Sequence, residues 1–254
     1  MDAGVFIRVL GPFQILKKGE PVSLRAGGKA EQLVGWLASH PNVGVHRATL
    51  VERIWPDASA ALGGQCLNTL VHSLKMQLCD GLGGAAPIVL SQGRYMLNLG
   101  SGLEVDILEF ESAVRDGHRH FTAGAVVAAI SSYELAVSLY RGDLVGGSDI
   151  SELLERERLR ATCLGTLARL ADAHFENANY EQALENALKL LAIDPCREDA
   201  HRMVMRAFVR LGARAQALRQ YNVCRSILRY EFDAIPEPAT EQLFTLIRTD
   251  PDQV

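Results

Sequence analysis

Residues 64–78 carry a row of polar side chains whose chemical groups suit the recognition of nucleic-acid base edges. At about 100° per residue, the spacing predicts one helical face that is formed by Gln65, Thr69, His72 and Met76 and flanked by Asn68 and Lys75. The opposite face is an apolar stripe formed by Leu67, Leu70, Val71, Leu74 and Leu78. A face that only meets solvent normally carries Glu and Lys, whereas this one is nearly uncharged. The helix is therefore either a recognition element or a plain polar surface.

The composition is that of a globular protein. With 254 residues, 48% of them hydrophobic, the chain can bury ample core in one large or two ordinary domains. No apolar run is long enough to span a bilayer, and the first ten residues lack the pattern of a signal peptide. We therefore expect a cytoplasmic protein without a membrane partner.

The cysteines indicate reduced thiols. Their number is odd, and no C-x-x-C pair occurs among Cys66, Cys79, Cys163, Cys196 and Cys224. Small buried thiols are thus expected rather than disulfides or a zinc site. We expect neither a metal nor a cofactor.

Charge is distributed unevenly along the chain. Residues 1–103 hold nine Lys or Arg against six Asp or Glu, whereas residues 104–254 hold 17 against 24. Only the first part is basic, so only the first part is suited to approach a polyanion.

The first hundred residues predict a small α+β module. Short β-type segments are expected at Phe6–Leu10, Phe13–Lys17 and Val22–Leu24, followed by helices at Lys29–Ser39, Arg47–Trp55 and 64–78. Residues 88–98 then alternate as a hairpin about Gln92-Gly93, where Gly93 can take positive φ. Sheet, three helices and a terminal hairpin predict a winged helix-turn-helix. In such a module the third helix enters the major groove and the hairpin lies along the backbone.

From Leu103 onward the pattern is almost entirely helical and repeats. Gln182-Ala183-Leu184 recurs as Gln216-Ala217-Leu218, an offset of 34 residues, which is the tetratricopeptide period. Flanking helices at Gly124–Tyr140 and Ala239–Arg248 are expected to cap the stack. The expected fold is thus a winged helix-turn-helix over residues 1–102 followed by an all-α tetratricopeptide-like domain over residues 103–254.

Enzyme motifs are poor, and we expect no enzymatic activity. Gly28-Lys29 lacks the first glycine and the final Ser or Thr of a phosphate-binding loop. His118 and His120 have no further ligand at metal-binding spacing and are expected in a solvated loop. A file of arginines at positions 202, 206, 210 and 214 is either a dock for an anionic partner or a solvated face with local pairs such as Glu198 with Arg202.

Several motifs together resemble the Streptomyces antibiotic regulatory protein family. The first half carries G-G-K at Gly27, L-V-E-R-I-W-P-D from Leu50 and L-N-T-L-V-H-S-L-K from Leu67, similar to the family's OmpR-type winged helix. The second half carries V-D-I-L-E-F-E from Val105 and I-P-E-P-A-T-E-Q-L from Ile235, similar to its bacterial transcriptional activator domain. Both domains stand in the family's order.

This resemblance implies particular site residues and partners. By the resemblance, phosphate contacts of double-stranded DNA map onto Lys29, Arg47 and Arg94. From the residue types we expect Lys75 to contact phosphate as well, and base edges to be contacted by Gln65, Asn68, Thr69 and His72. The loop expected to face RNA polymerase, through its sigma factor and other subunits, comprises Asp57, Ala58, Ser59, Ala60, Ala61 and Leu62.

The resemblance implies a transcriptional activator that binds promoter-proximal direct repeats, as a homo-oligomer on tandem sites, and recruits polymerase. The alternative is a non-enzymatic adaptor. In that case the helical repeats bind a protein partner and the winged helix no longer reads DNA.

Overall fold

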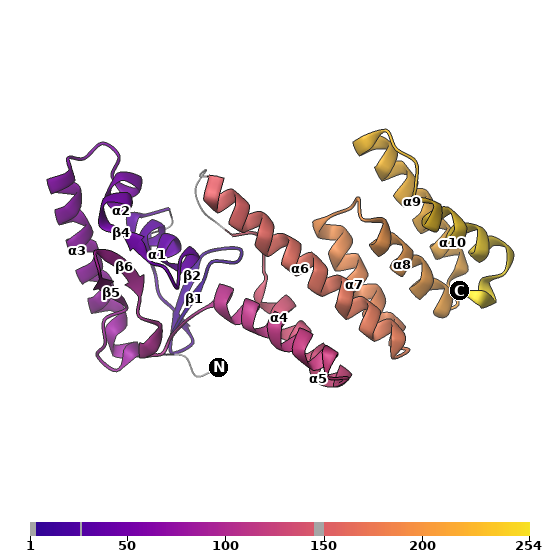
Figure 1. Cartoon of the computed structure of the whole chain (residues 1–254), viewed down its shortest axis with the longest axis horizontal. Helices are drawn as coiled ribbons and strands as arrows, with labels where there is room; N and C mark the ends of the chain where they lie inside the picture. The colour runs from indigo at the N-terminus through magenta and orange to yellow at the C-terminus, as the bar shows by residue number, and fades with distance from the viewer. Residues whose placement is uncertain (1–3, 26, 145–149) are drawn as a thin grey trace. The chain divides into compact units, whose positions relative to one another are not determined.

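A computed structural model describes residues 4–25, 27–144 and 150–254 (Figure 1). The chain forms two compact units. One holds the residues up to Ala113 together with Ser138–Leu159, and the other holds Val114–Val137 together with Arg160–Val254. A boundary at residue 102 remains a prediction about which pieces fold independently.

The amino-terminal sheet has the strand order β3-β2-β1-β7. Strands β1 (Val5–Arg8), β2 (Gln14–Lys17) and β3 (Glu20–Pro21) are antiparallel neighbours, and β7 (Leu103–Val105) pairs in parallel with β1. The prediction of a strand at Val22–Leu24 is wrong. Lys18 and Gly19 both have positive φ, 51° and 84°, and this tight turn sets Glu20 directly opposite Lys17.

Three helices and a second sheet complete the winged helix. Helix α1 (Lys29–Ser39) has its predicted bounds, and α2 (Arg47–Ile54) ends one residue before its predicted end. The second sheet has the order β4-β6-β5, where β5 (Ile88–Ser91) and β6 (Arg94–Leu97) form the predicted hairpin and β4 (Val45–His46) pairs with β6. In the turn Gln92 and Gly93 have φ of 50° and 75°, the combination of a type I′ turn.

Helix α3 (Ala60–Leu78) begins earlier than expected. Ser59 is its N-cap, and the Ser59 hydroxyl accepts a hydrogen bond from the amide of Leu62. Ala60, Ala61 and Leu62 therefore lie in the first helical turn, and placing them in a loop was wrong. Asp57, Ala58 and Ser59 remain in the connection between α2 and α3.

The chain passes through two short 3₁₀ turns before α4 (Asp106–Thr122), which starts at a buried carboxylate. After η1 (Cys79–Leu82), η2 (Leu99–Ser101) and β7, this helix starts at Asp106. The Asp106 carboxylate is 1% exposed and accepts hydrogen bonds from the amides of Val9, at 3.0 and 2.9 Å, and Leu10, at 2.9 Å. The end of β1 and the start of α4 are thereby joined.

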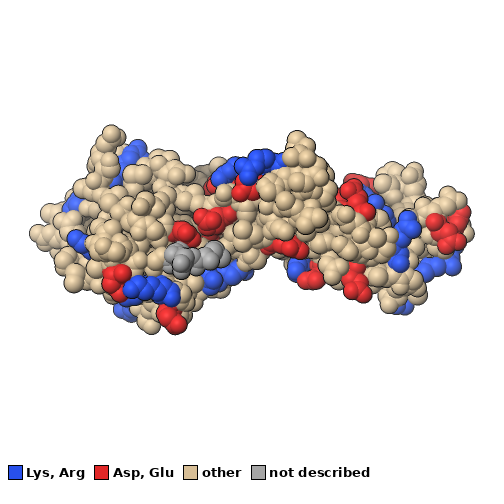
Figure 2. All heavy atoms as spheres, turned by 90° about the horizontal axis from the view of Figure 1, so that it is seen from below, with Lys and Arg blue, Asp and Glu red and all other residues tan. Residues whose placement is uncertain are grey.

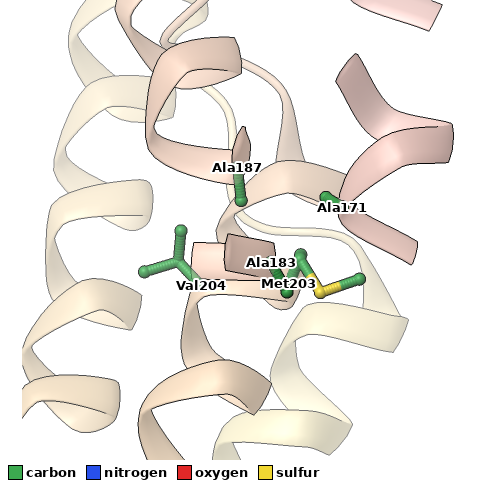
Figure 3. Packing of buried hydrophobic residues seen from close by; sticks show 5 residues of the cluster. All are labelled: Ala171, Ala183, Ala187, Met203 and Val204. Carbon is green, nitrogen blue, oxygen red and sulfur yellow. The ribbon is translucent and has the colours of Figure 1, made fainter. Parts of the chain in front are cut away.

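The remaining helices form the repeat. They are α5 (Val126–Leu139), α6 (Ile150–Glu176), α7 (Tyr180–Ile193), α8 (Glu198–Arg210), α9 (Arg214–Phe232) and α10 (Pro238–Thr249), followed by η3 (Pro251–Gln253). The repeated alanines Ala183 and Ala217 are both fully buried, as the small-residue rule for closely crossing helices requires. Figure 3 shows Ala183 in one such contact, with Ala171 from α6, Ala187 from α7, and Met203 and Val204 from α8.

Two expectations about polar residues of this part were wrong. His118 and His120 lie within α4 rather than in a loop, and the His118 ring packs edge-on against Tyr133 at 5.6 Å. The four arginines do not form one file along a helix, because α8 ends at Arg210 and α9 begins at Arg214. Arg210 is exposed, whereas Arg202 and Arg214 bind α10. Arg202 donates to the Glu237 carboxylate and the Thr240 hydroxyl, and Arg214 donates to the carbonyls of Ile247 and Arg248.

None of the helices in the described ranges combines the length and apolar character needed to cross a membrane. All five cysteines are free thiols. Burial raises the pKa of the Cys224 thiol to about 12, so this thiol stays protonated at neutral pH.

Candidate nucleic-acid interface

The exposed face of α3 holds the predicted base-reading residues together. Leu67, Leu74 and Leu78 are at most 2% exposed and anchor the helix in the core. Gln65, Asn68, Thr69 and His72 are all exposed, as their spacing predicts. The Thr69 hydroxyl donates to the carbonyl of Gln65 at 3.1 Å, so its hydrogen is used within the helix.

Two glycines at the start of α3 allow it to approach α2 closely. A Cβ atom on Gly63 would overlap Cγ1 of Val51, and one on Gly64 would lie 2.7 Å from Nη2 of Arg47. The two glycines thus bring Arg47 of α2 into hydrogen-bonding range of α3.

Arg47 is the centre of a network that fixes Asn68. Its guanidinium donates to Asn68 Oδ1 at 2.9 Å, to the Tyr95 hydroxyl at 2.8 Å and to the Gly64 carbonyl at 2.8 Å. The Tyr95 hydroxyl in turn donates to Asn68 Oδ1 at 3.4 Å. Because Arg47 can only donate, the Asn68 oxygen must face it, and the amide nitrogen is left for an outside acceptor.

The other residues assigned to phosphates differ in how much of their hydrogen-bonding capacity is used internally. The Lys29 ammonium donates to the carbonyl of Ile54 at the end of α2. Arg94, just after the hairpin turn, donates to the Gly44 carbonyl at 3.3 Å. Lys75 is exposed near the end of α3. An ammonium group has three donors and a guanidinium five, so Lys29 and Arg94 keep donors for a phosphate.

Sequence reasoning missed Tyr95 and the structural role of Arg47. The side chain of Tyr95 comes from β6, 48 residues from Arg47 and 27 from Asn68. Local spacing carries no signal for contacts of this range. A weak signal in the sequence was the position of Tyr95, an aromatic residue that directly follows Arg94 in the predicted wing.

A shallow hollow lies where the expected polymerase-facing loop meets α3. It has a volume of about 540 Å³, and its walls come from Trp55, Leu62, Gln65, Cys66, Thr69, Leu70 and Ser73. Leu62 is 54% exposed although it is a large apolar residue. An exposed apolar side chain beside a hollow is suited to contact with another protein.

The described residues hold no candidate metal cluster, and charges of both signs are mixed on one face of the helical part. Within the described part of the chain, His, Cys, Asp and Glu form no group of three or more able to hold a metal ion. On the face shown in Figure 2, basic and acidic side chains are interspersed over the helical half.

The combination of a winged helix-turn-helix with a tetratricopeptide-like repeat domain defines a class of bacterial regulators. A model of the bacterial transcriptional activator domain matches residues 105–248, more than half of the chain. The chain is 26% identical over 256 residues to the regulatory protein DnrI of Streptomyces peucetius, with 96% of this chain and 93% of DnrI covered.

Two mycobacterial proteins are also similar. The transcriptional regulatory protein MoaR1 of Mycobacterium tuberculosis is 24% identical over 243 residues, which cover 94% of this chain and 78% of MoaR1. The structure of Mycobacterium tuberculosis EmbR matches with a TM-score of 0.73 at 18% identity, over 99% of this chain and 68% of EmbR, and supports the fold.

The chain belongs to the Streptomyces antibiotic regulatory protein family. It is a transcriptional activator, and its relatives are regulators rather than enzymes.

Proposed function

We propose that this activator reads promoter-proximal direct repeats of double-stranded DNA through α3 and recruits RNA polymerase, in the cytoplasm. The observation that carries the proposal is the fixed Asn68 amide. A side chain held by Arg47 and Tyr95 on an otherwise solvent-exposed helical face is preorganised to meet a ligand there.

Base reading is assigned to the four exposed polar residues of α3. Gln65 and His72 supply further donors and acceptors for the major groove. Thr69 has used its hydroxyl hydrogen and is left with its methyl group, which suits the methyl group of thymine. Phosphate contacts by Lys29, Arg47, Lys75 and Arg94 would position the helix without reading sequence.

Polymerase recruitment is assigned to residues 57–62 and the adjoining hollow. The exposed Leu62 and the half-buried Trp55 supply an apolar contact beside the DNA-facing helix. A sigma factor or another polymerase subunit bound at the promoter would approach from this side.

Substitution of Leu62 by Ser is expected to lower transcription in vitro while operator affinity is unchanged. A parallel loss of affinity would show that the residue positions α3 instead.

Binding-site selection from random duplex DNA tests the reading function directly. Wild-type protein is expected to enrich a direct repeat, and the Asn68→Ala variant is expected to lose preference at one or two base pairs of each half-site. Failure of the wild type to enrich any sequence overturns the proposal.

A second function is favoured by one observation. Lys29, Arg47 and Arg94 all donate to protein groups, which limits their grip on DNA. A protein-binding adaptor would need no such grip. Because counterion release makes DNA binding steeply salt-dependent, absence of retention on a DNA column at every salt concentration favours the adaptor.

A further inference from the structure

The helical repeats form a half-open hollow to which the proposed DNA function assigns no role. It has a volume of about 310 Å³ and lies among α6, α7, α8 and α10. Its apolar walls are made of small and medium side chains, among them Ala171, Ala187, Leu190, Met203 and Leu243. Figure 3 shows Ala171, Ala187 and Met203 from three different helices in the same packing cluster.

Charged side chains also line the hollow, and they differ in how well they are paired. Arg202 is bound to Glu237 and Thr240, and Asp199 is bound to Arg197. By contrast, Asp172 and Arg206 stand 3.8 Å apart, beyond hydrogen-bonding distance. The Nε of Arg206 is buried and has no hydrogen-bond partner among the described residues.

The surroundings of this loose pair hold both charges at the hollow. The Arg206 guanidinium lies over the Phe175 ring, 5.0 Å from its centroid, which orients it. The Asp172 side chain is 60% exposed and free to accept further donors. Partial burial raises the pKa of the Asp172 carboxyl, the Arg206 charge lowers it, and the nearby carboxylates of Glu176 and Asp199 raise it further.

Size and charge together narrow the chemistry of an occupant. A volume of about 310 Å³ is at the lower end for ligand sites and accommodates a small molecule rather than a long peptide segment. A simple anion would meet the Asp172 carboxylate, and a simple cation would meet the Arg206 guanidinium. A molecule with both an ammonium and a carboxylate group satisfies the pair, and an apolar body suits the alanine, leucine and methionine walls.

We infer that this hollow is a binding site for a small apolar zwitterion, of which a free aliphatic α-amino acid is the simplest. The Asp172 carboxylate would accept from the ammonium group and the Arg206 guanidinium would donate to the carboxylate. The site goes beyond the proposed DNA function and does not depend on it.

Titration of the full chain with L-leucine, followed by saturation-transfer NMR, tests this inference. Saturable binding is expected. Each of two analogues that lack one charge, 4-methylpentanoate and 3-methylbutylamine, is expected to bind at least about tenfold more weakly, because each leaves one charged group unsatisfied.

Variants place the binding in the hollow. Asp172→Asn and Arg206→Gln are each expected to weaken L-leucine binding at least about tenfold. Arg210→Gln, at an exposed position of the same helix, is the matched control and is expected to leave binding unchanged. Absence of saturable binding, equal affinity for the analogues, or no effect of Asp172→Asn overturns the inference. So does tighter binding of an end-blocked peptide than of L-leucine.

Discussion

At the scale of single residues, Arg47 decides which side of the Asn68 amide is offered to DNA. Bidentate pairing with adenine uses both the oxygen and the nitrogen of an amide. Here the oxygen already accepts from Arg47 and Tyr95, so the nitrogen donor remains. Asn68 is therefore suited to a base edge that presents acceptors, such as guanine O6 and N7 or thymine O4, rather than to adenine alone.

Asn68→Asp separates the internal role of this residue from its external one. The carboxylate still accepts from Arg47 and Tyr95, so the free energy of unfolding should be unchanged or higher. DNA affinity should fall by about 1 to 3 kcal/mol or more on the preferred site, because the nitrogen donor is lost and a negative charge faces the groove. Fluorescence anisotropy with a labelled duplex and urea unfolding measure the two effects.

Asn68→Ala is the companion variant for that experiment. It should lose a similar amount of affinity and also some stability, since Arg47 loses an acceptor. If Asn68→Asp binds the preferred site as tightly as the wild type, Asn68 does not read DNA. The adaptor function then gains support.

Asp106 is a second residue whose charge and hydrogen bonds are separable. Burial raises the pKa of its carboxyl above the ordinary value of 3.8, against the opposing effect of the Leu10 and Val9 amides. Asp106→Asn keeps an oxygen for those amides and removes the buried charge, so at neutral pH its stability should lie within about 1 kcal/mol of the wild type. Asp106→Ala leaves both amides unsatisfied and should cost about 2 to 4 kcal/mol.

The raised pKa of Asp106 fixes how the stability difference between the Asp106→Asn variant and the wild type changes with pH. A raised folded-state pKa means that the contribution of Asp106 to stability is fully present below pH 3.8 and is lost as the pH rises through the folded value. The stability of Asp106→Asn relative to wild type should therefore increase from acidic to neutral pH. Urea unfolding at several pH values measures this difference, and a decrease over the same range would contradict it.

At the scale of elements, local patterns predicted the helices and missed the short strands. The bounds of α1 and the offset of 34 residues between repeats follow from apolar spacing that a helix imposes within a few turns. Strands β4 and β7 have only two and three residues, and their partners lie far away in sequence. The Arg47, Asn68 and Tyr95 network was unpredictable for the same reason.

The contact between α8 and α10 uses a residue for which sequence spacing predicted a different partner. Glu198 is spaced to pair with Arg202 along α8, yet its carboxylate accepts from the Glu237 amide at 2.8 Å and the Thr240 hydroxyl at 2.6 Å. Glu237 is the N-cap of α10, so Glu198 supplies the capping acceptor from another helix.

Glu198→Ala should therefore lower the stability of the helical repeats by about 1 to 3 kcal/mol, since the buried Thr240 and the Glu237 amide both lose an acceptor. Thermal unfolding of the full chain, monitored by circular dichroism, measures the effect. Glu185→Ala is the matched control, because Glu185 forms an exposed i, i+4 pair with Lys189 that contributes about 0.3 to 0.5 kcal/mol. Equal losses in the two variants would show that Glu198 does not cap α10.

At the scale of the whole molecule, the separation of functions along the chain is testable by truncation. A fragment of residues 1–102 lacks β7 and Asp106, which complete the edge of the sheet beside β1. A fragment of residues 1–113 keeps both and should unfold at higher urea concentration. Both fragments should bind DNA and residues 103–254 should not; binding by the latter alone would reverse the assignment of domains.

The first hundred residues carry only a modest positive charge, so each phosphate contact should have a measurable effect on DNA affinity and on its salt dependence. Lys29 and Arg94 each use a donor within the protein, and only Lys75 among the assigned phosphate contacts is fully on the exposed face of α3. Lys75→Ala should consequently lower the slope of log affinity against log salt by about one unit, since one phosphate contact contributes about 0.9 to that slope.

Because few basic side chains are available to contact phosphates, we expect one copy to bind DNA weakly. Useful affinity should then require two copies on tandem half-sites. When two copies contact each other on adjacent half-sites, the first bound copy raises the effective local concentration of the second. The affinity for a tandem duplex should therefore exceed that for a single half-site by about 10²-fold or more. Spacing matters, because half-sites about one helical turn apart place both copies on the same side of the duplex. Inserting about half a turn between them should remove the gain. Anisotropy titrations of the three duplexes at equal salt decide the matter: a single half-site bound as tightly as the tandem would mean that one copy grips DNA by itself.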